Sequence, residues 1–189
     1  ILDIGCGAGH LLKACEKLNV EAEGFDPNFE LVNLGKKFLK KNSIKHIDLK
    51  SWNTKIINSK KRVLCLMGVL EHLKDPNLLL RTFVKSNIKY LYIQVPLFSL
   101  SSFIENIFPN IYPRVLSGGH THLYTKESLD FLAKKYKLEI IGEWWFGTDI
   151  ADLYRSISVL SKNKNKTYLS LIDKYVNNPI DKLQNVLDS

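Results

Sequence analysis

An aspartate and three alternating glycines near the start of the chain are the first residues whose spacing suggests chemistry. Asp3 is followed by Gly5, Gly7 and Gly9, and glycines in such a turn let the backbone bend sharply and let a ligand come close. The dinucleotide fingerprint needs a glycine where this sequence has His10, and the sequence contains no Gly-Lys-Ser/Thr phosphate loop. Because the Asp3 carboxylate would repel a pyrophosphate but attract an amino cation, the pattern favours a cationic ligand without phosphate.

The pattern Asp-x-Gly-x-Gly-x-Gly resembles motif I of the class I S-adenosylmethionine-dependent methyltransferases. S-adenosylmethionine carries an α-amino cation and a sulfonium but no phosphate, in agreement with an acid at this position. By this resemblance the cofactor would lie at the end of the first strand and over the loop, and the cofactor-binding residues predicted there are Asp3, Gly5, Cys6, Gly7, Gly9 and His10. A glycine-rich turn that binds no ligand is the alternative interpretation.

Two more acids follow the second and third expected strands. Asp26 stands nineteen residues after Gly7, where a carboxylate can accept hydrogen bonds from both ribose hydroxyls of a nucleoside. The other interpretation of Asp26 is a helix N-cap, although Asn28 could supply that cap equally well. By the resemblance, Asp48 would bind the adenine amino group and Leu49 would cover the purine ring.

The run from Met67 to Leu73 follows the fourth expected strand. Its Val-Leu-Glu-His-Leu stretch resembles the signature of a large group of small-molecule methyltransferases (type 11/23-like). The resemblance places Met67 and Gly68 against the cofactor, with Gly68 letting its methionine part pass close. Glu71 and His72 would lie near the transferred methyl group and are candidate catalytic residues. The alternative interpretation is that His72 caps a helix, or that it holds other site residues in place without contacting the substrate.

A further histidine, His120, follows a pair of glycines and precedes Tyr-Thr-Lys-Glu-Ser-Leu. This stretch resembles the family's histidine followed by Phe-Thr-Pro-Glu-Ser-Leu, with Lys126 in place of the proline. A neutral imidazole at His120 could take a proton from a hydroxyl acceptor, which makes it the main candidate for a general base. The alternative is a histidine that only binds the substrate or holds a loop in place.

Alternating strand and helix patterns predict an α/β fold: a doubly wound, mostly parallel sheet of the Rossmann-like methyltransferase type. The expected strands are Ile1–Ile4, Val20–Asp26, Ile44–Leu49, Arg62–Met67, Tyr90–Val95 and Leu138–Trp145. Helices are expected from about Gly9 to Leu18, after Asn28, after Asp75-Pro76, after Thr125, over Asp149–Leu160 and, broken at Pro179, over Leu169–Leu187. The family's usual seventh, antiparallel strand has no candidate, so we expect a sheet without complete ends.

We expect a methyltransferase domain over residues 1–160 and a helical extension over residues 161–189. Within the domain, the connection over 97–124 is long and rich in aromatic residues. Loops of this length in compact domains are usually functional, so it is interpreted as a lid over the substrate. Because Ile1 already belongs to the first expected strand, the sequence suggests a fragment of a longer chain.

Composition limits the partners of the protein. The 189 residues are 45% hydrophobic and 24% charged, as in a soluble globular domain. We see no membrane span or signal peptide, and Cys6, Cys15 and Cys65 lack metal-ligand spacing, which favours a reducing, cytoplasmic location without a metal site. A net charge of +8 could mark an RNA-binding surface, but lysine-rich helices give the same charge, so nucleic acid is not the expected partner.

The expected function is methyl transfer from S-adenosylmethionine to a small hydroxylated metabolite, such as a sugar or a sugar nucleotide. An RNA methyltransferase and a non-catalytic S-adenosylmethionine-binding module are the alternatives. The sequence contains no Asn-Pro-Pro-Tyr run, which argues against methylation of amino groups in DNA. It does not predict the acceptor atom or the oligomeric state.

Overall fold

The structure is a computed structural model that describes residues 1–40, 43–108, 116, 119–147, 149–160, 170, 171, 173–177 and 179–188. It divides into two compact units, Ile1–Pro96 and Leu97–Ser189, which are described separately below. Among the described residues, no helix combines the length and the apolar composition needed to cross a membrane.

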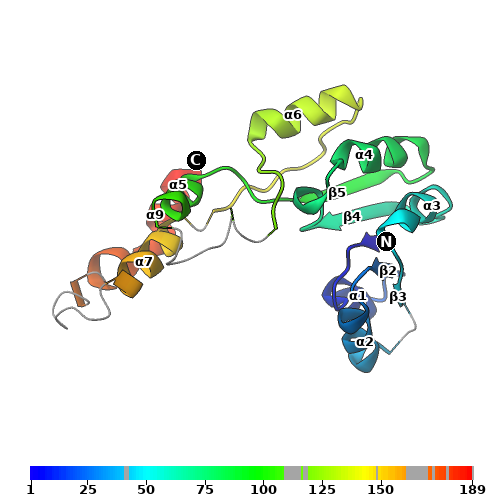
Figure 1. The fold of residues 1–189 in the computed structure, drawn as a ribbon, viewed down its shortest axis with the longest axis horizontal. Helices are drawn as coiled ribbons and strands as arrows, with labels where there is room; N and C mark the ends of the chain where they lie inside the picture. Colours follow the sequence, from blue (N-terminus) through cyan, green and yellow to red (C-terminus); the bar gives the residue numbers. More distant parts are fainter. Residues whose placement is uncertain are drawn as a thin grey trace. The chain divides into compact units, whose positions relative to one another are not determined.

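The first unit is built on a parallel sheet (Figure 1). Its strands are β1 (Leu2–Ile4), β2 (Glu23–Asp26), β3 (Ile44–His46), β4 (Val63–Met67) and β5 (Tyr90–Gln94), in the order β3-β2-β1-β4-β5. All neighbouring pairs are parallel, so the carboxyl ends of the strands meet at one edge. The strand order reverses beside β1, and ligands bind at such a point in open α/β sheets. The expected α/β class with a parallel sheet is confirmed.

Helices flank this sheet. They are α1 (His10–Lys17), α2 (Phe29–Phe38), α3 (Trp52–Ile57) and α4 (Pro76–Lys85), with short 3₁₀ turns η1 (Leu49–Ser51) and η2 (Leu70–His72). Leu12, Val32, Leu39 and Ile44 form a core that joins α1 and α2 to β3. Figure 1 shows α3 and α4 close together beside β4 and β5. The apolar strand residues Leu2, Ile4, Leu64 and Leu66 are fully buried, as the continuous apolar runs of a central parallel strand require.

Local capping residues set where the helices begin. The Asn28 side chain accepts hydrogen bonds from the backbone N–H groups of Glu30 and Leu31, at the start of α2. Asp75 accepts one from Leu78 N and is followed by a proline in the first turn of α4, as predicted. Neither cap depends on distant parts of the chain, which is why the sequence alone could identify them.

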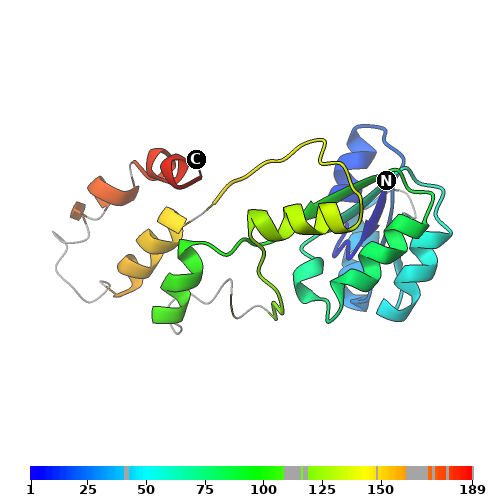
Figure 2. The same cartoon turned by 90° about the horizontal axis from the view of Figure 1, so that it is seen from above.

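The second unit contains α5 (Leu100–Ile107), α6 (Lys126–Lys135), α7 (Asp149–Leu160), a π-helical turn η3 (Asp173–Asn177) and α9 (Ile180–Asp188). Figures 1 and 2 both show α5 and α7 side by side. A β-bridge pairs Leu97 with Tyr124, at the two ends of the predicted lid. Thr125 caps α6, and the chain turns at Pro179 before α9, both as expected.

Buried carboxylates join α7 to the start of α5. One Asp149 oxygen accepts hydrogen bonds from Ser99 Oγ and Ser101 N, each at 2.6 Å, and Asp152 accepts one from Ser101 Oγ at 2.8 Å. Although burial alone would raise it, hydrogen bonds from Ser99 and Ser101 bring the pKa of Asp149 below its usual value. These acids therefore anchor α5 within the second unit.

Several expected elements differ in the structure. The predicted strand Leu138–Trp145 is wrong: residues 138–147 form no strand, and Ile141 and Trp144 are largely exposed. Residues 138–145 are rich in strand-favouring residue types, but a strand also needs a hydrogen-bonding neighbour. The expected second and third strands are shorter, and helix α5 occupies part of the predicted lid. Residues 109–115, 117 and 118 of that lid, and 161–169 of the predicted extension, lie outside the described residues.

Candidate functional site

The glycine loop turns from β1 into α1 through three left-handed residues. Gly5, Gly7 and Gly9 have φ values of 74°, 54° and 83°, a region that side chains rarely adopt. A Cβ atom at Gly5 would lie 2.6 Å from Cγ2 of Val69, whereas a Cβ atom at Gly7 would meet nothing within 4 Å. Gly5 is therefore packed against the protein, and the backbone at Gly7 is open to a ligand.

Asp26, the last residue of β2, fixes this loop. Its Oδ2 accepts a hydrogen bond from Gly7 N at 2.7 Å, and its Oδ1 accepts one from Asn28 N at 2.8 Å. Asn28 supplies the N-cap of α2, so Asp26 is not the cap. Because each carboxylate oxygen can accept more than one hydrogen bond, Asp26 keeps acceptor capacity for a ligand.

Asp3 lies on β1 with 2% of its surface exposed. Burial, and to a smaller extent the negative charge of Asp26, raises the pKa of this carboxyl to about 7. The salt bridges found among the described residues do not include Asp3. A cation bound beside Asp3 would favour its ionised form, since an opposite charge stabilises a carboxylate.

A hollow lies at the carboxyl ends of the strands in the first unit. Its volume is about 270 Å³, and its lining residues are Gly5, Asp26, Pro27, Leu49, Trp52, Gly68, Val69, His72 and Leu73. A second hollow of about 430 Å³ is lined by Pro27, Asp48, Leu49 and Lys50. Because both share Pro27 and Leu49, they adjoin. The structure thus brings together Gly5, Asp26, Asp48, Gly68 and His72, which the sequence places far apart.

The η2 turn and the end of β4 form one side of this hollow. Gly68 follows Met67 with a φ of 66° and donates its N–H to Gln94 O at 3.0 Å. A Cβ atom at Gly68 would lie 3.7 Å from Glu71 Oε1, an ordinary contact distance. Glu71 is buried, whereas the neighbouring His72 is exposed and lines the hollow. His72 is therefore the more accessible of the two predicted catalytic residues in this unit.

Cys6 and His10 pack against neighbouring elements. A Cβ atom at Gly24 would lie 2.8 Å from Cys6 Sγ, so the thiol occupies the space above β2 that this glycine leaves. Burial, together with the charges of Asp3 and Asp26, raises the pKa of Cys6 above its usual range. The imidazole of His10 stacks on the ring of Phe38 at 5.9 Å. Cys6 thus packs the loop against β2, and His10 packs the start of α1 against α2.

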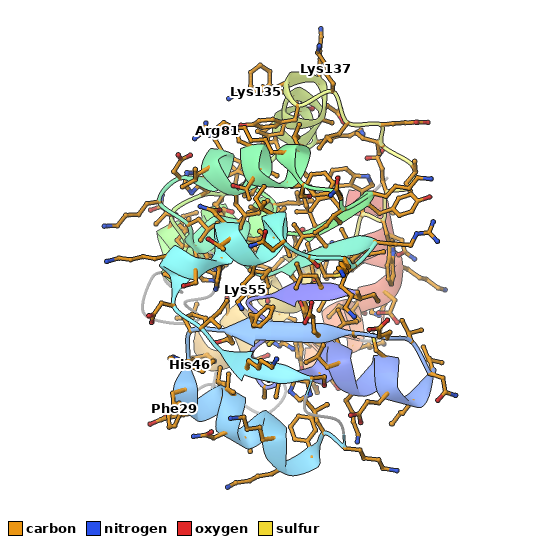
Figure 3. All side chains as sticks on the ribbon, turned by 90° about the vertical axis from the view of Figure 1, so that its right-hand side faces the viewer. Phe29, His46, Lys55, Arg81, Lys135 and Lys137 are labelled. Carbon is orange, nitrogen blue, oxygen red and sulfur yellow. The ribbon has the colours of Figure 1, made fainter. Side chains whose placement is uncertain are left out.

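Two aromatic rings lie close to Pro27, a residue that lines both hollows. Figure 3 labels Phe29, at the start of α2, and His46, at the end of β3. Their rings meet edge to face at 5.7 Å, and His46 Nε2 lies 3.1 Å from Pro27 O. This contact steadies Pro27, which lines both hollows.

His120 lies in the second unit, directly after Gly119, whose φ is 76°. The imidazole is half-buried. The role of His120 as general base stays a prediction from the sequence pattern.

Sequence reasoning missed Trp52, which lines the hollow from the first turn of α3. It also missed Pro27, Val69 and Leu73. A signal for Trp52 existed, because it is a large aromatic residue inside a polar stretch of serine, asparagine and lysine. Such a residue is buried or functional more often than its neighbours are.

Comparison with known proteins agrees with this arrangement. A family model described as a methyltransferase domain matches residues 1–143. A search of the curated proteins found no match. Several solved structures are similar in fold.

A SAM dependent methyltransferase from Archaeoglobus fulgidus has a TM-score of 0.58 and 19% identity over 86% of this chain and 78% of that one. Magnesium protoporphyrin IX methyltransferase from Synechocystis PCC 6803, with bound SAH, has a TM-score of 0.58 and 12% identity over 78% and 68%. The YcgJ protein from Bacillus subtilis has a TM-score of 0.56 and 16% identity over 92% and 74%. At these identities the structures support the fold alone. Because the methyltransferase model covers residues 1–143, the chain belongs to the methyltransferase domain family, as the resemblance of its motifs to the class I enzymes predicts.

Proposed function

We propose that the protein transfers the methyl group of S-adenosylmethionine to a hydroxyl of a small metabolite, with a sugar or a sugar nucleotide as the acceptor class. The observation that carries this proposal is the hollow at the carboxyl ends of β1, β2 and β4, where Asp26 stands beside the open backbone of Gly7. A nucleoside bound there could donate its ribose hydroxyls to Asp26.

The residues present fit this cofactor. Asp3 is a buried acid that takes part in none of the salt bridges found among the described residues, and it would bind the α-amino cation. Asp26 would accept the ribose hydroxyls, while Asp48 and Leu49, on the adjoining hollow, would contact adenine. The glycine loop and Gly68 would allow close approach of the backbone. The cofactor, when bound, supplies a methyl carbon that its sulfonium activates.

The protein must then align the acceptor oxygen with this carbon, and alignment is where proximity contributes most. As the oxygen gains the methyl group, its proton must leave. We propose that His120 accepts that proton, with His72 and Glu71 as the next candidates. S-adenosylhomocysteine would be the second product, since its sulfur would keep the electron pair of the broken bond to carbon. If His120 only binds the acceptor, the proton would pass to solvent.

We retain residues 1–160 as the proposed catalytic domain, with the segment 97–124 as its lid and 161–189 as an extension. The three cysteines are free thiols in the structure, which is compatible with the proposed cytoplasmic location. RNA is the second candidate acceptor, because the chain carries a net charge of +8.

The test is product formation by the purified protein. It would be incubated with S-adenosylmethionine and separate panels of sugars, sugar nucleotides and RNA, and S-adenosylhomocysteine would be measured by mass spectrometry. We expect product above the acceptor-free level with a small hydroxylated acceptor. Turnover with RNA alone, falling steeply as salt increases, would support the RNA alternative. Binding of the cofactor without turnover on any panel would support a non-catalytic module.

A further inference from the structure

We infer that Trp52 is a cofactor-positioning residue whose indole N–H donates a hydrogen bond to the nucleoside part of the bound cofactor. The inference rests on the proposed function and adds a contact that the family motifs of this sequence do not include.

Trp52 is 6% exposed and lines the hollow. Its ring packs against the glycine loop, because a Cβ atom at Gly5 would lie 3.7 Å from Cη2 of Trp52. Asp26 and Leu49 line the same hollow and are the residues proposed for ribose and adenine. Trp52 therefore stands where the nucleoside would bind.

The Nε1 atom of Trp52 is buried and has no hydrogen-bond acceptor among the described residues. Buried polar groups in proteins are nearly always paired, and an indole N–H is a donor only. The side-chain oxygen that follows it in the sequence, Asn53 Oδ1, already accepts a hydrogen bond from Thr82 at 3.0 Å. The indole N–H of Trp52 therefore has no hydrogen-bond acceptor among the described residues.

The chemistry of the cofactor limits the possible partner. Its α-amino group and its sulfonium are cationic and cannot accept a hydrogen bond. Purine nitrogens and ribose oxygens can accept one, and the place of Trp52 beside Asp26 and Leu49 selects this nucleoside part. Trp52 would thereby fix the rotation of the nucleoside, while Asp26 fixes its ribose.

The matched control is Trp145. Its indole N–H donates to Glu143 Oε2 at 2.9 Å, within the second unit. Trp52→Phe and Trp145→Phe each remove one indole N–H and keep an aromatic ring. Calorimetry with S-adenosylhomocysteine should show about 2- to 12-fold weaker binding for Trp52→Phe, as expected for the loss of one neutral hydrogen bond. Trp145→Phe should bind as the parent does.

Nuclear magnetic resonance gives a readout that does not depend on affinity. The chain has three tryptophans, so a ¹⁵N-labelled sample gives few indole signals, and the Trp144→Phe and Trp145→Phe variants identify the remaining one as Trp52. This signal should move downfield when S-adenosylhomocysteine is added to the parent, because the N–H gains an acceptor. Even if Trp52→Phe fails to fold, this measurement decides the inference.

An unmoved Trp52 signal in a parent that binds S-adenosylhomocysteine would overturn the inference and leave the proposed function standing. Equal affinities of Trp52→Phe and Trp145→Phe would do the same. If the parent binds no S-adenosylhomocysteine, the proposed function fails, and the role of Trp52 fails with it.

Discussion

Replacing Asp3 with asparagine should stabilise the ligand-free protein at neutral and alkaline pH while weakening its binding of the cofactor. Asp3 is 2% exposed, and burial followed by the charge of Asp26 raises its pKa to about 7. Ionising this group in the folded protein is therefore unfavourable. Asparagine keeps a similar shape but carries no charge, so the folded protein no longer has to bury one.

The size of the effect follows from linkage between ionisation and folding. In the unfolded chain Asp3 ionises near its usual value of 3.8. Below that pH the Asp3 carboxyl is neutral in both the folded and the unfolded chain, and the folded protein is not penalised. As pH rises toward 7, ionisation favours the unfolded chain, so stability falls, and above 7 the loss is complete. Each pKa unit corresponds to roughly 1.4 kcal/mol, so Asp3→Asn should increase the free energy of unfolding by up to about 4 kcal/mol at pH 8 relative to its effect at pH 3.5.

Urea unfolding of the ligand-free parent and Asp3→Asn, at several pH values from 3.5 to 8, measures this difference. Asp48→Asn, at an exposed position, is the control and should change stability by less than about 0.5 kcal/mol throughout. At pH 8, Asp3→Asn should also bind S-adenosylhomocysteine roughly 10- to 150-fold more weakly, since a charged hydrogen bond is lost. A stability difference that does not change with pH would refute this account of Asp3.

Other changes separate the parts of the site. Asp26→Ala should weaken S-adenosylhomocysteine binding about 10- to 150-fold in calorimetry, and unchanged affinity would remove Asp26 from the site. Gly5→Ala should lower unfolding free energy more than Gly7→Ala, by about 1–3 kcal/mol in urea titrations, because only the first meets Val69; equal losses would contradict the packing described. His120→Ala should slow turnover about 10²- to 10⁴-fold at saturating acceptor without changing cofactor affinity, and near-parental turnover would exclude it as the base.

The parts of the fold that the sequence predicted well are those with local causes. The glycine loop, the Asn28 and Asp75 caps and the buried strands depend on residue types within a few positions of one another. Helix α5 also had a local signal, since Ser99 and Ser102 form a capping box before an amphipathic stretch. The aromatic residues around it favoured a loop interpretation instead.

The features that the sequence could not predict depend on distant partners. Residues 138–145 are rich in isoleucine and tryptophan, which favour strands, yet no described strand pairs with them. Trp52 belongs to the hollow only because the turn after β3 brings it next to Gly5. Two strands and two helices separate these residues in the sequence. The positions of Asp26 and Asp48 after their strands were enough to predict them as site residues. The other residues that line the hollow, such as Trp52 and Val69, could not be predicted because tertiary packing brings them there.

Calorimetric titration of the parent and of Asp26→Ala with S-adenosylhomocysteine, and of the parent with NAD, decides which cofactor the glycine loop binds. We expect saturable binding of S-adenosylhomocysteine to the parent, much weaker binding to Asp26→Ala, and no binding of NAD, whose pyrophosphate Asp3 would repel. Binding of NAD to the parent, or equal binding of S-adenosylhomocysteine to both proteins, would contradict this expectation.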